Sequence, residues 1–171
     1  MADNYLEKRM EDYRRGTHPT AHRTAGPRAG RLSMPYPHQY VLVAGADTEA
    51  GTAAVEAFVA AGCTVAFTTA GTDSDGRRLA QRLGARYYPG TPADALADME
   101  RRGEAIGTVI HTAAPAATVP GACNILITAS SQPYDGLLVI AAPTTAAAAA
   151  ARIALMCAYP GTALPPQLIT L

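Results

Sequence analysis

The sequence predicts an α/β fold of three layers, in which helices cover both faces of a doubly wound, mainly parallel sheet. From Tyr40 onward, short apolar runs of strand length alternate with helical segments, which is the pattern of repeated βαβ units. Hydrophobic residues make up 49% of the chain and charged residues only 16%, as expected for an α/β interior. The length of 171 residues suits one such domain.

An N-terminal helix and an extended arm are expected to precede this domain, over residues 1–39. Leu6, Met10 and Tyr13 recur at helical spacing, and Gly16 provides a stop signal. The following stretch, Thr17–His38, contains four prolines and no acidic residue, which disfavours regular structure. It is expected to be either an ordered strap or a disordered linker.

The domain itself is expected over residues 40–171, and its first half alternates regularly. Strands are predicted at Tyr40–Ala44, Thr64–Thr69, Ala85–Pro89 and Thr108–Thr112, with helices between them at Gly51–Ala61, Asp75–Leu83 and Thr91–Arg102. Gly62 and Gly84 follow the first two helices as stop signals. Thr91, Pro92 and Asp94 have the spacing of a capped helix start.

The second half is less regular, so its topology stays open at this point. Further strands are predicted at Asn124–Thr128, Gly136–Ala142 and Gln167–Leu171, and a long alanine-rich helix at Thr144–Tyr159. The gap Ala113–Cys123 contains Pro115 and Pro120, which disfavour a crossover helix. Because only the hairpin-sized segment Ala129–Asp135 joins two of these strands, one of them is expected at an edge or antiparallel.

Charge argues against some partners and suggests another. Fourteen basic residues balance fourteen acidic ones, so no global charge favours a nucleic acid or a membrane. Residues 1–39 carry seven basic and four acidic side chains, whereas the rest of the chain carries seven and ten. The arm is thus positive and the domain negative, and we expect the arm to hold a homo-oligomer together by wrapping a neighbouring subunit.

The cysteines and the N-terminus indicate the compartment. Cys63, Cys123 and Cys157 are odd in number and widely spaced, which fits reduced, buried thiols better than disulfides or a metal site. The sequence has no signal-peptide pattern at its start and no apolar run of membrane-spanning length. A cytoplasmic protein without a metal cofactor is therefore expected.

The turn after the first predicted strand carries the main functional signal. The strand runs into Gly45, Ala46 and Asp47, and a helix begins near Gly51. A glycine lets the chain reverse sharply there, and N–H groups at the helix start face an anionic phosphate. In this layout the chain resembles the short-chain dehydrogenase/reductase family, which has a Rossmann-like fold. Gly45 and Gly51 match the first and third glycines of the family motif, whereas Glu49 replaces the middle one.

The resemblance implies a site for NADP or NAD. Its cofactor-binding residues would be Gly45, Ala46, Asp47, Gly51, Arg77 and Ala113. The family favours NADP when an arginine follows the second strand, and Arg77 and Arg78 lie shortly downstream here, although both also suit a solvated helix face. Glu49 adds bulk and negative charge, so dinucleotide affinity should fall unless its side chain turns outward.

The resemblance does not extend to the family's catalytic apparatus. That apparatus uses a serine and a tyrosine with a lysine four residues later, which lowers the pKa of the tyrosine. Ser130 resembles the serine, but Tyr134 is followed by Leu138 at the lysine position, and Lys8 is the only lysine of the chain. A truncated, degenerate relative without standard reductase activity is therefore implied.

Two alternatives remain open. The chain could be a scaffold or interaction protein that binds no ligand and is held in an oligomer by its arm. It could also be an atypical oxidoreductase that uses His111 or Tyr134 as its proton donor. His111 ends the fourth predicted strand, where ligands bind in doubly wound folds, but no carboxylate partner is evident and a structural role suits it as well.

Overall fold

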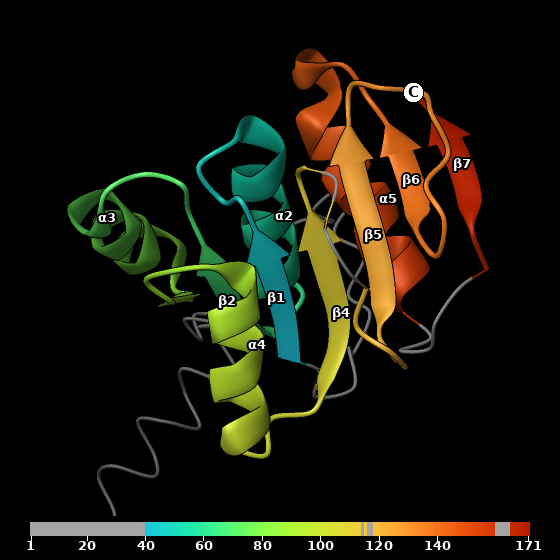
Figure 1. Cartoon of the computed structure of the whole chain (residues 1–171). Helices are drawn as coiled ribbons and strands as arrows, with labels where there is room; N and C mark the ends of the chain where they lie inside the picture. The colour runs from blue at the N-terminus through green and yellow to red at the C-terminus, as the bar shows by residue number, and fades with distance from the viewer. Residues whose placement is uncertain (1–39, 114, 116–117, 160–164) are drawn as a thin grey trace, which may run out of the picture. The chain divides into compact units, whose positions relative to one another are not determined.

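Seven strands and four α-helices make up the domain in the computed structural model, which describes residues 40–113, 115, 118–159 and 165–171 (Figure 1). In chain order the elements are β1 (Tyr40–Ala44), α2 (Glu49–Ala60), β2 (Thr64–Thr68), α3 (Asp73–Leu83), β3 (Arg86–Tyr87), α4 (Pro92–Arg101), β4 (Ile106–His111), β5 (Cys123–Thr128), β6 (Leu138–Ala141), the 3-10 turn η1 (Thr144–Ala146), α5 (Ala147–Ala158) and β7 (Gln167–Thr170). The predicted N-terminal helix and arm, and with them the predicted oligomer contact, lie outside the described residues.

The strands form one sheet in the order β3-β2-β1-β4-β5-β6-β7, and every neighbouring pair is parallel. The chain first builds outward from β1 through β2 to β3, then returns to add β4 on the other side of β1. The order therefore reverses between β1 and β4, which is where doubly wound sheets bind ligands. The predicted three-layer, doubly wound fold is confirmed.

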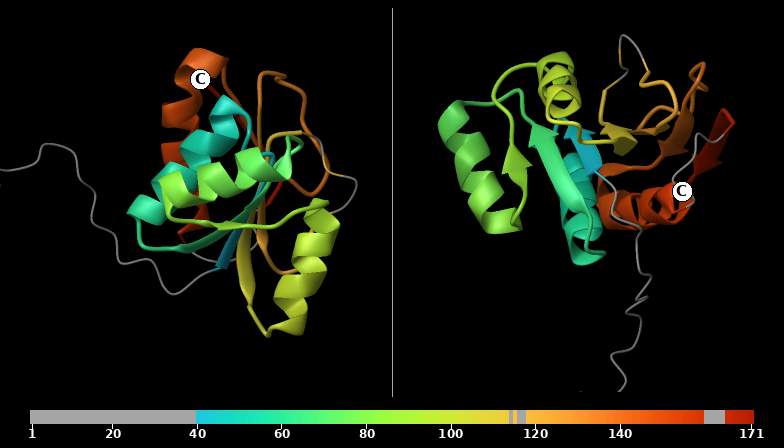
Figure 2. Two further views of the ribbon diagram at one scale, coloured as in Figure 1. Left: turned by 90° about the vertical axis from the view of Figure 1, so that its left-hand side faces the viewer. Right: turned by 90° about the horizontal axis from the view of Figure 1, so that it is seen from below.

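Helices lie on both faces of the sheet, as the alternation of strand side chains requires. Val43 and Ile110 face the core that contains Phe58 of α2 and the alanines of α5, and α3 packs on the same side. Leu42 and Val109 point the opposite way, toward Met99 of α4. Figure 2 shows α2 and α5 together on one face and α4 on the other.

Local signals set the ends of the helices, and among them the start at Thr91 and the stop at Gly84 were predicted. Thr48, Thr72 and Thr91 are the N-caps of α2, α3 and α4, and each hydroxyl accepts a hydrogen bond from a backbone N–H of the first turn. Thr91 and Asp94 complete a capping box, and Gly84 ends α3 in the left-handed conformation at φ 68°.

Within the described residues, no helix combines the length and apolar character needed to cross a membrane.

The strands predicted after residue 123 are present, but the prediction that one of the first two is an edge strand or antiparallel was wrong. β5 and β6 are parallel neighbours, and neither is an edge strand, because β7 pairs with the far side of β6. β6 has only four residues and rises about 13 Å, so an irregular connection can return along it without a helix. Side chains of that connection, Tyr134 and Leu137, pack with Leu126 and Val139 and take the place of a helix on this face.

Candidate functional site

The turn between β1 and α2 is built for close contact between chain segments. Gly45 has φ 91°, and a Cβ atom there would collide with Oγ1 of Thr112, just beyond β4. Gly51 lies in the first turn of α2, where a Cβ would collide with the Gly45 carbonyl oxygen and lie 2.8 Å from Cα of Ala46. Gly45 thus permits the reversal, and Gly51 lets the helix start directly over the strand end.

Three threonine hydroxyls donate hydrogen bonds to the carbonyl groups of this turn. Thr48 Oγ1 lies 2.9 Å from the Gly45 oxygen, and Thr52 Oγ1 lies 2.7 Å from the Ala46 oxygen. Thr112 Oγ1 lies 3.1 Å from the Ala44 oxygen, which joins the ends of β1 and β4. The first N–H groups of α2, those of Glu49 and Ala50, have no acceptor within the helix, and such groups are the ones that bind anions at helix N-termini.

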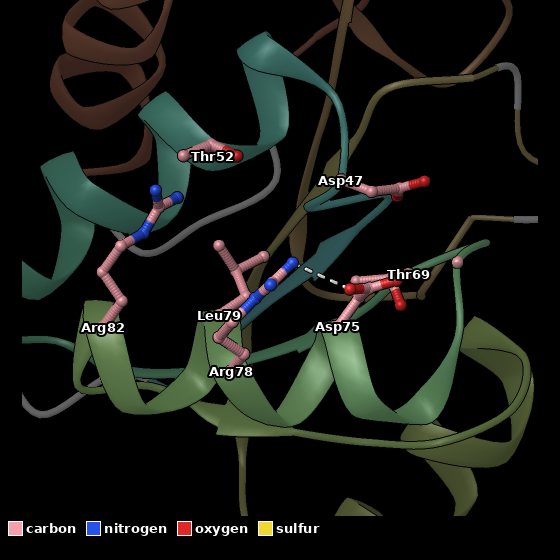
Figure 3. Close-up of a pocket in the computed structure, with 8 residues that line it drawn as sticks. Asp47, Thr52, Thr69, Asp75, Arg78, Leu79 and Arg82 are labelled. Carbon is pink, nitrogen blue, oxygen red and sulfur yellow. Dashed lines mark hydrogen bonds and ion pairs between the residues drawn. The ribbon is translucent and has the colours of Figure 1, made fainter.

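One hollow, here called the first hollow, lies between α2 and α3 beyond the carboxyl ends of β1 and β2. It has a volume of about 470 Å³ (Figure 3). Its lining consists of Asp47, Thr52, Thr69, Gly71, Asp75, Arg78, Leu79 and Arg82. The Asp47 carboxylate accepts a hydrogen bond from the Ala70 N–H at 3.3 Å, which ties the β1–α2 turn to the loop after β2.

Two arginines supply positive charge to the first hollow. Figure 3 shows Arg78 and Arg82 rising from α3 toward α2. Arg78 pairs with Asp75 at 2.9 Å, but the two side chains are 82% and 55% exposed, so this pair holds them only weakly. Among the described residues no carboxylate forms an ion pair with Arg82. Arg77, the arginine implied by the resemblance, is not part of the lining.

A second hollow, of about 160 Å³, lies beside the same turn at the carboxyl ends of β5 and β6. Its lining consists of Thr48, Glu49, Ala50, Thr112, Ile127, Thr128, Ala129, Ala142, Pro143, Thr144 and Ala147. Hydroxyl groups and apolar side chains dominate it, and Glu49 is its one ionisable residue. Glu49 thus borders the site at the position of the middle motif glycine.

The candidate catalytic residues lie apart from both hollows. His111 is 5% exposed, and burial lowers its pKa, an effect that the nearby Asn124 side chain partly opposes. Tyr134 packs beside Leu126 and Leu137, away from the strand ends. Ser130 follows β5, and its N–H donates to Thr128 Oγ1 at 3.2 Å. None of these three side chains lines either hollow.

The structure also adds residues that the sequence reasoning missed. Thr48, Thr52 and Thr112 orient the turn, and Arg82 faces the first hollow. A threonine directly before a helix is a capping signal, so Thr48 could have been found from the sequence. Ala113, implied as a cofactor residue, is exposed next to Thr112, and it is Thr112 that lines the second hollow.

No metal site emerges from the part of the chain that the structure covers. No group of three or more His, Cys, Asp or Glu side chains is placed to hold an ion there. Cys63 and Cys123 are buried, and burial raises the pKa of the Cys63 thiol to about 11. These thiols are packing groups rather than ligands.

Comparison with known proteins yields matches among solved structures. No family model and no curated protein matches the sequence. The structure of BdcA (YjgI) from E. coli has a TM-score of 0.55 and 18% identity, covering 75% of this chain and 94% of that one. BdcA in complex with NADPH matches with a TM-score of 0.44 and 24% identity, over 71% of this chain and 62% of the other.

A double mutant of a Serratia marcescens short-chain dehydrogenase/reductase gives a TM-score of 0.39 and 16% identity, over 71% of this chain and 66% of that one. The present chain thus spans less than two thirds of the length of the Serratia marcescens protein and of the NADPH-bound BdcA chain. The likeness to the first BdcA structure concerns the fold, and it confirms the predicted Rossmann-like fold.

Proposed function

We propose that this chain binds NADP across the β1–β4 switch point and lacks the tyrosine–lysine reductase chemistry of the family it resembles. The observation that carries the proposal is the position of the glycine turn between two hollows, one lined by arginines and the other by hydroxyl and apolar groups. A dinucleotide has a central pyrophosphate and two different arms, which is the shape that such an arrangement accepts.

The pyrophosphate would bind at the N-terminus of α2. The free N–H groups of Glu49 and Ala50 point outward from the first turn, and the helix dipole favours an anion there. The threonine hydroxyls occupy the nearby carbonyl oxygens of Gly45 and Ala46, which would otherwise repel a phosphate. Gly51 allows this helix end to approach the strand closely.

The adenosine arm would occupy the first hollow, because that is where the arginines lie, although Asp47 and Asp75 line it as well. Arg78 and Arg82 can bind the phosphate on the 2′ position of NADP, for which the planar guanidinium is well suited. NAD has a free ribose hydroxyl at that position and gains nothing from these charges. NADP should therefore bind more tightly than NAD.

The nicotinamide arm would then occupy the second hollow. No Tyr, Lys or His side chain is present in its described lining, so no group of the usual kind stands there to deliver a proton to a carbonyl. The solved complex of BdcA, whose fold this chain shares, contains NADPH. For the present chain the proposal is a binding protein for the cofactor rather than a standard reductase.

Titration of the full chain with NADP and NAD, by isothermal calorimetry and thermal shift, tests the proposal. The wild-type chain should bind NADP. Arg82→Ala should lower the affinity for NADP about tenfold or more, as expected for the loss of one charge-assisted phosphate contact, and should leave the affinity for NAD unchanged. Arg77→Ala is the matched control, since Arg77 belongs to the same helix but does not line the hollow.

Two results would reject the proposal. The first is the absence of any binding or stabilisation at millimolar NADP. The second is an equal effect of Arg82→Ala on NADP and NAD, because that would place the arginine away from the 2′-phosphate.

A further inference from the structure

The side chain of Glu49 has no role in the binding scheme above, which uses only its backbone N–H. Glu49 is the first residue of α2 and an exposed one, and it lines the second hollow. Within the described residues no Arg or Lys pairs with its carboxylate. Anything that enters the second hollow meets one negative charge among hydroxyl and apolar groups.

The two oxidation states of a nicotinamide cofactor differ in the charge of one ring. The oxidised ring carries a positive charge, and the reduced ring is neutral. A carboxylate beside the ring stabilises the first form by Coulomb attraction and leaves the second nearly unaffected. We infer that Glu49 makes this chain a selective binder of the oxidised cofactor, NADP⁺, over NADPH, an inference that rests on the proposed function.

The remaining lining of the second hollow agrees with this assignment. Thr48, Thr112, Thr128 and Thr144 supply hydroxyl groups without net charge, so nothing on the described walls opposes the effect of Glu49. The arginines that could do so, Arg78 and Arg82, line the first hollow instead. Cationic side chains thus line only the first hollow, where Asp47 and Asp75 accompany them, and the second hollow is left with the Glu49 carboxylate as its one ionisable group.

Repulsion between Glu49 and the pyrophosphate does not disturb the comparison. Both oxidation states carry the same phosphates, so this repulsion weakens the binding of both cofactors equally. It therefore cancels from the ratio of their dissociation constants. Removing the carboxylate should strengthen binding of NADPH, whereas for NADP⁺ the lost attraction to the ring opposes the relieved repulsion, so the ratio should change. The ratio alone reports the charge felt by the ring.

The test measures the dissociation constants of NADPH, by its own fluorescence, and of NADP⁺, by calorimetry and by displacement of NADPH. The wild-type chain should prefer NADP⁺ by about fivefold or more, the factor that opposite unit charges about 4 Å apart produce even at the dielectric constant of water. Glu49→Gln should bring the ratio close to one. Glu56→Gln is the matched control, because Glu56 is an exposed carboxylate of the same helix that lines neither hollow.

The outcomes separate this inference from the proposed function. If both cofactors bind and the ratio is the same in the wild-type chain and in Glu49→Gln, the inference is overturned while the binding proposal stands. If Glu56→Gln changes the ratio as much as Glu49→Gln, the selectivity comes from overall charge and the inference is again overturned. If neither form binds the wild-type chain, the proposed function itself fails.

Discussion

The contact between Gly45 and Thr112 gives the sharpest test of the structure, because two glycines with nearly the same φ can be compared. Gly45 and Gly62 have φ values of 91° and 88°, and alanine is strained at both. A Cβ at position 45 collides with Thr112 Oγ1, whereas a Cβ at position 62 meets nothing within 4 Å. The two substitutions therefore differ by the steric contact alone.

The magnitudes follow from these two contributions. The backbone strain costs about 1–2 kcal/mol at either site. Overpacking against Thr112 adds about 1–3 kcal/mol at position 45. We expect Gly62→Ala to lower the free energy of unfolding by about 1–2 kcal/mol and Gly45→Ala to lower it by about 2–5 kcal/mol.

A double-mutant cycle with Thr112→Ala isolates the contact. That substitution removes Oγ1 and leaves the Thr112 Cβ, which lies 3.5 Å from the added atom and is an ordinary neighbour. Thr112→Ala alone should cost about 1 kcal/mol for its lost hydrogen bond to the Ala44 oxygen. Combined with Gly45→Ala it should recover about 1–3 kcal/mol relative to additivity. Thr112→Ser keeps the hydroxyl and should recover little.

Urea unfolding followed by circular dichroism measures these differences, since the chain has no tryptophan to serve as a fluorescent probe. Equal destabilisation by Gly45→Ala and Gly62→Ala would refute the reasoning. So would an additive cycle between positions 45 and 112, because it would mean that the turn and the end of β4 do not meet as described.

Two further predictions concern buried polar groups. Burial lowers the pKa of His111 in the folded state, so the unfolded chain binds more protons at this residue when the pH is lowered. The neutral imidazole therefore favours the folded state above about pH 6.5, and this stability is lost as the pH falls below that value. The free energy of unfolding should therefore fall less steeply from pH 7 to pH 5 in His111→Gln than in the wild-type chain, and identical slopes would contradict the assignment. Arg86 donates two hydrogen bonds to the Glu104 carboxylate, at 2.7 and 2.8 Å, and the Glu104 side chain is only 11% exposed. Arg86→Ala leaves this carboxylate without its partner and should therefore lower the free energy of unfolding by about 1–3 kcal/mol. Arg101→Ala breaks the more exposed pair with Asp98 and should cost less than about 0.5 kcal/mol in the same urea experiment; equal costs would show that burial of Glu104 does not matter.

Local patterns determined much of this protein before its tertiary structure was known. The strand that ends at Ala44, the glycine that follows it and the threonine-capped helices were predictable, because each depends on side chains within a few positions of one another. The capping box at Thr91 and the positive φ of Gly45 are such short-range features. A parallel, doubly wound sheet followed from the alternation of strands and helices.

The arrangement of the candidate site was decided only in three dimensions. Thr112 reaches the turn across 68 positions of sequence from Ala44, and no local pattern encodes that contact. The packing of α3 beside α2 places Arg82 at the first hollow. The sequence had indicated Arg77 of the same helix, which does not line this hollow. The parallel pairing of β5 and β6 likewise depends on a loop that packs against the sheet. Contacts between distant segments are selected by the packing of the whole domain, which is why local sequence predicted the elements but not the site they enclose.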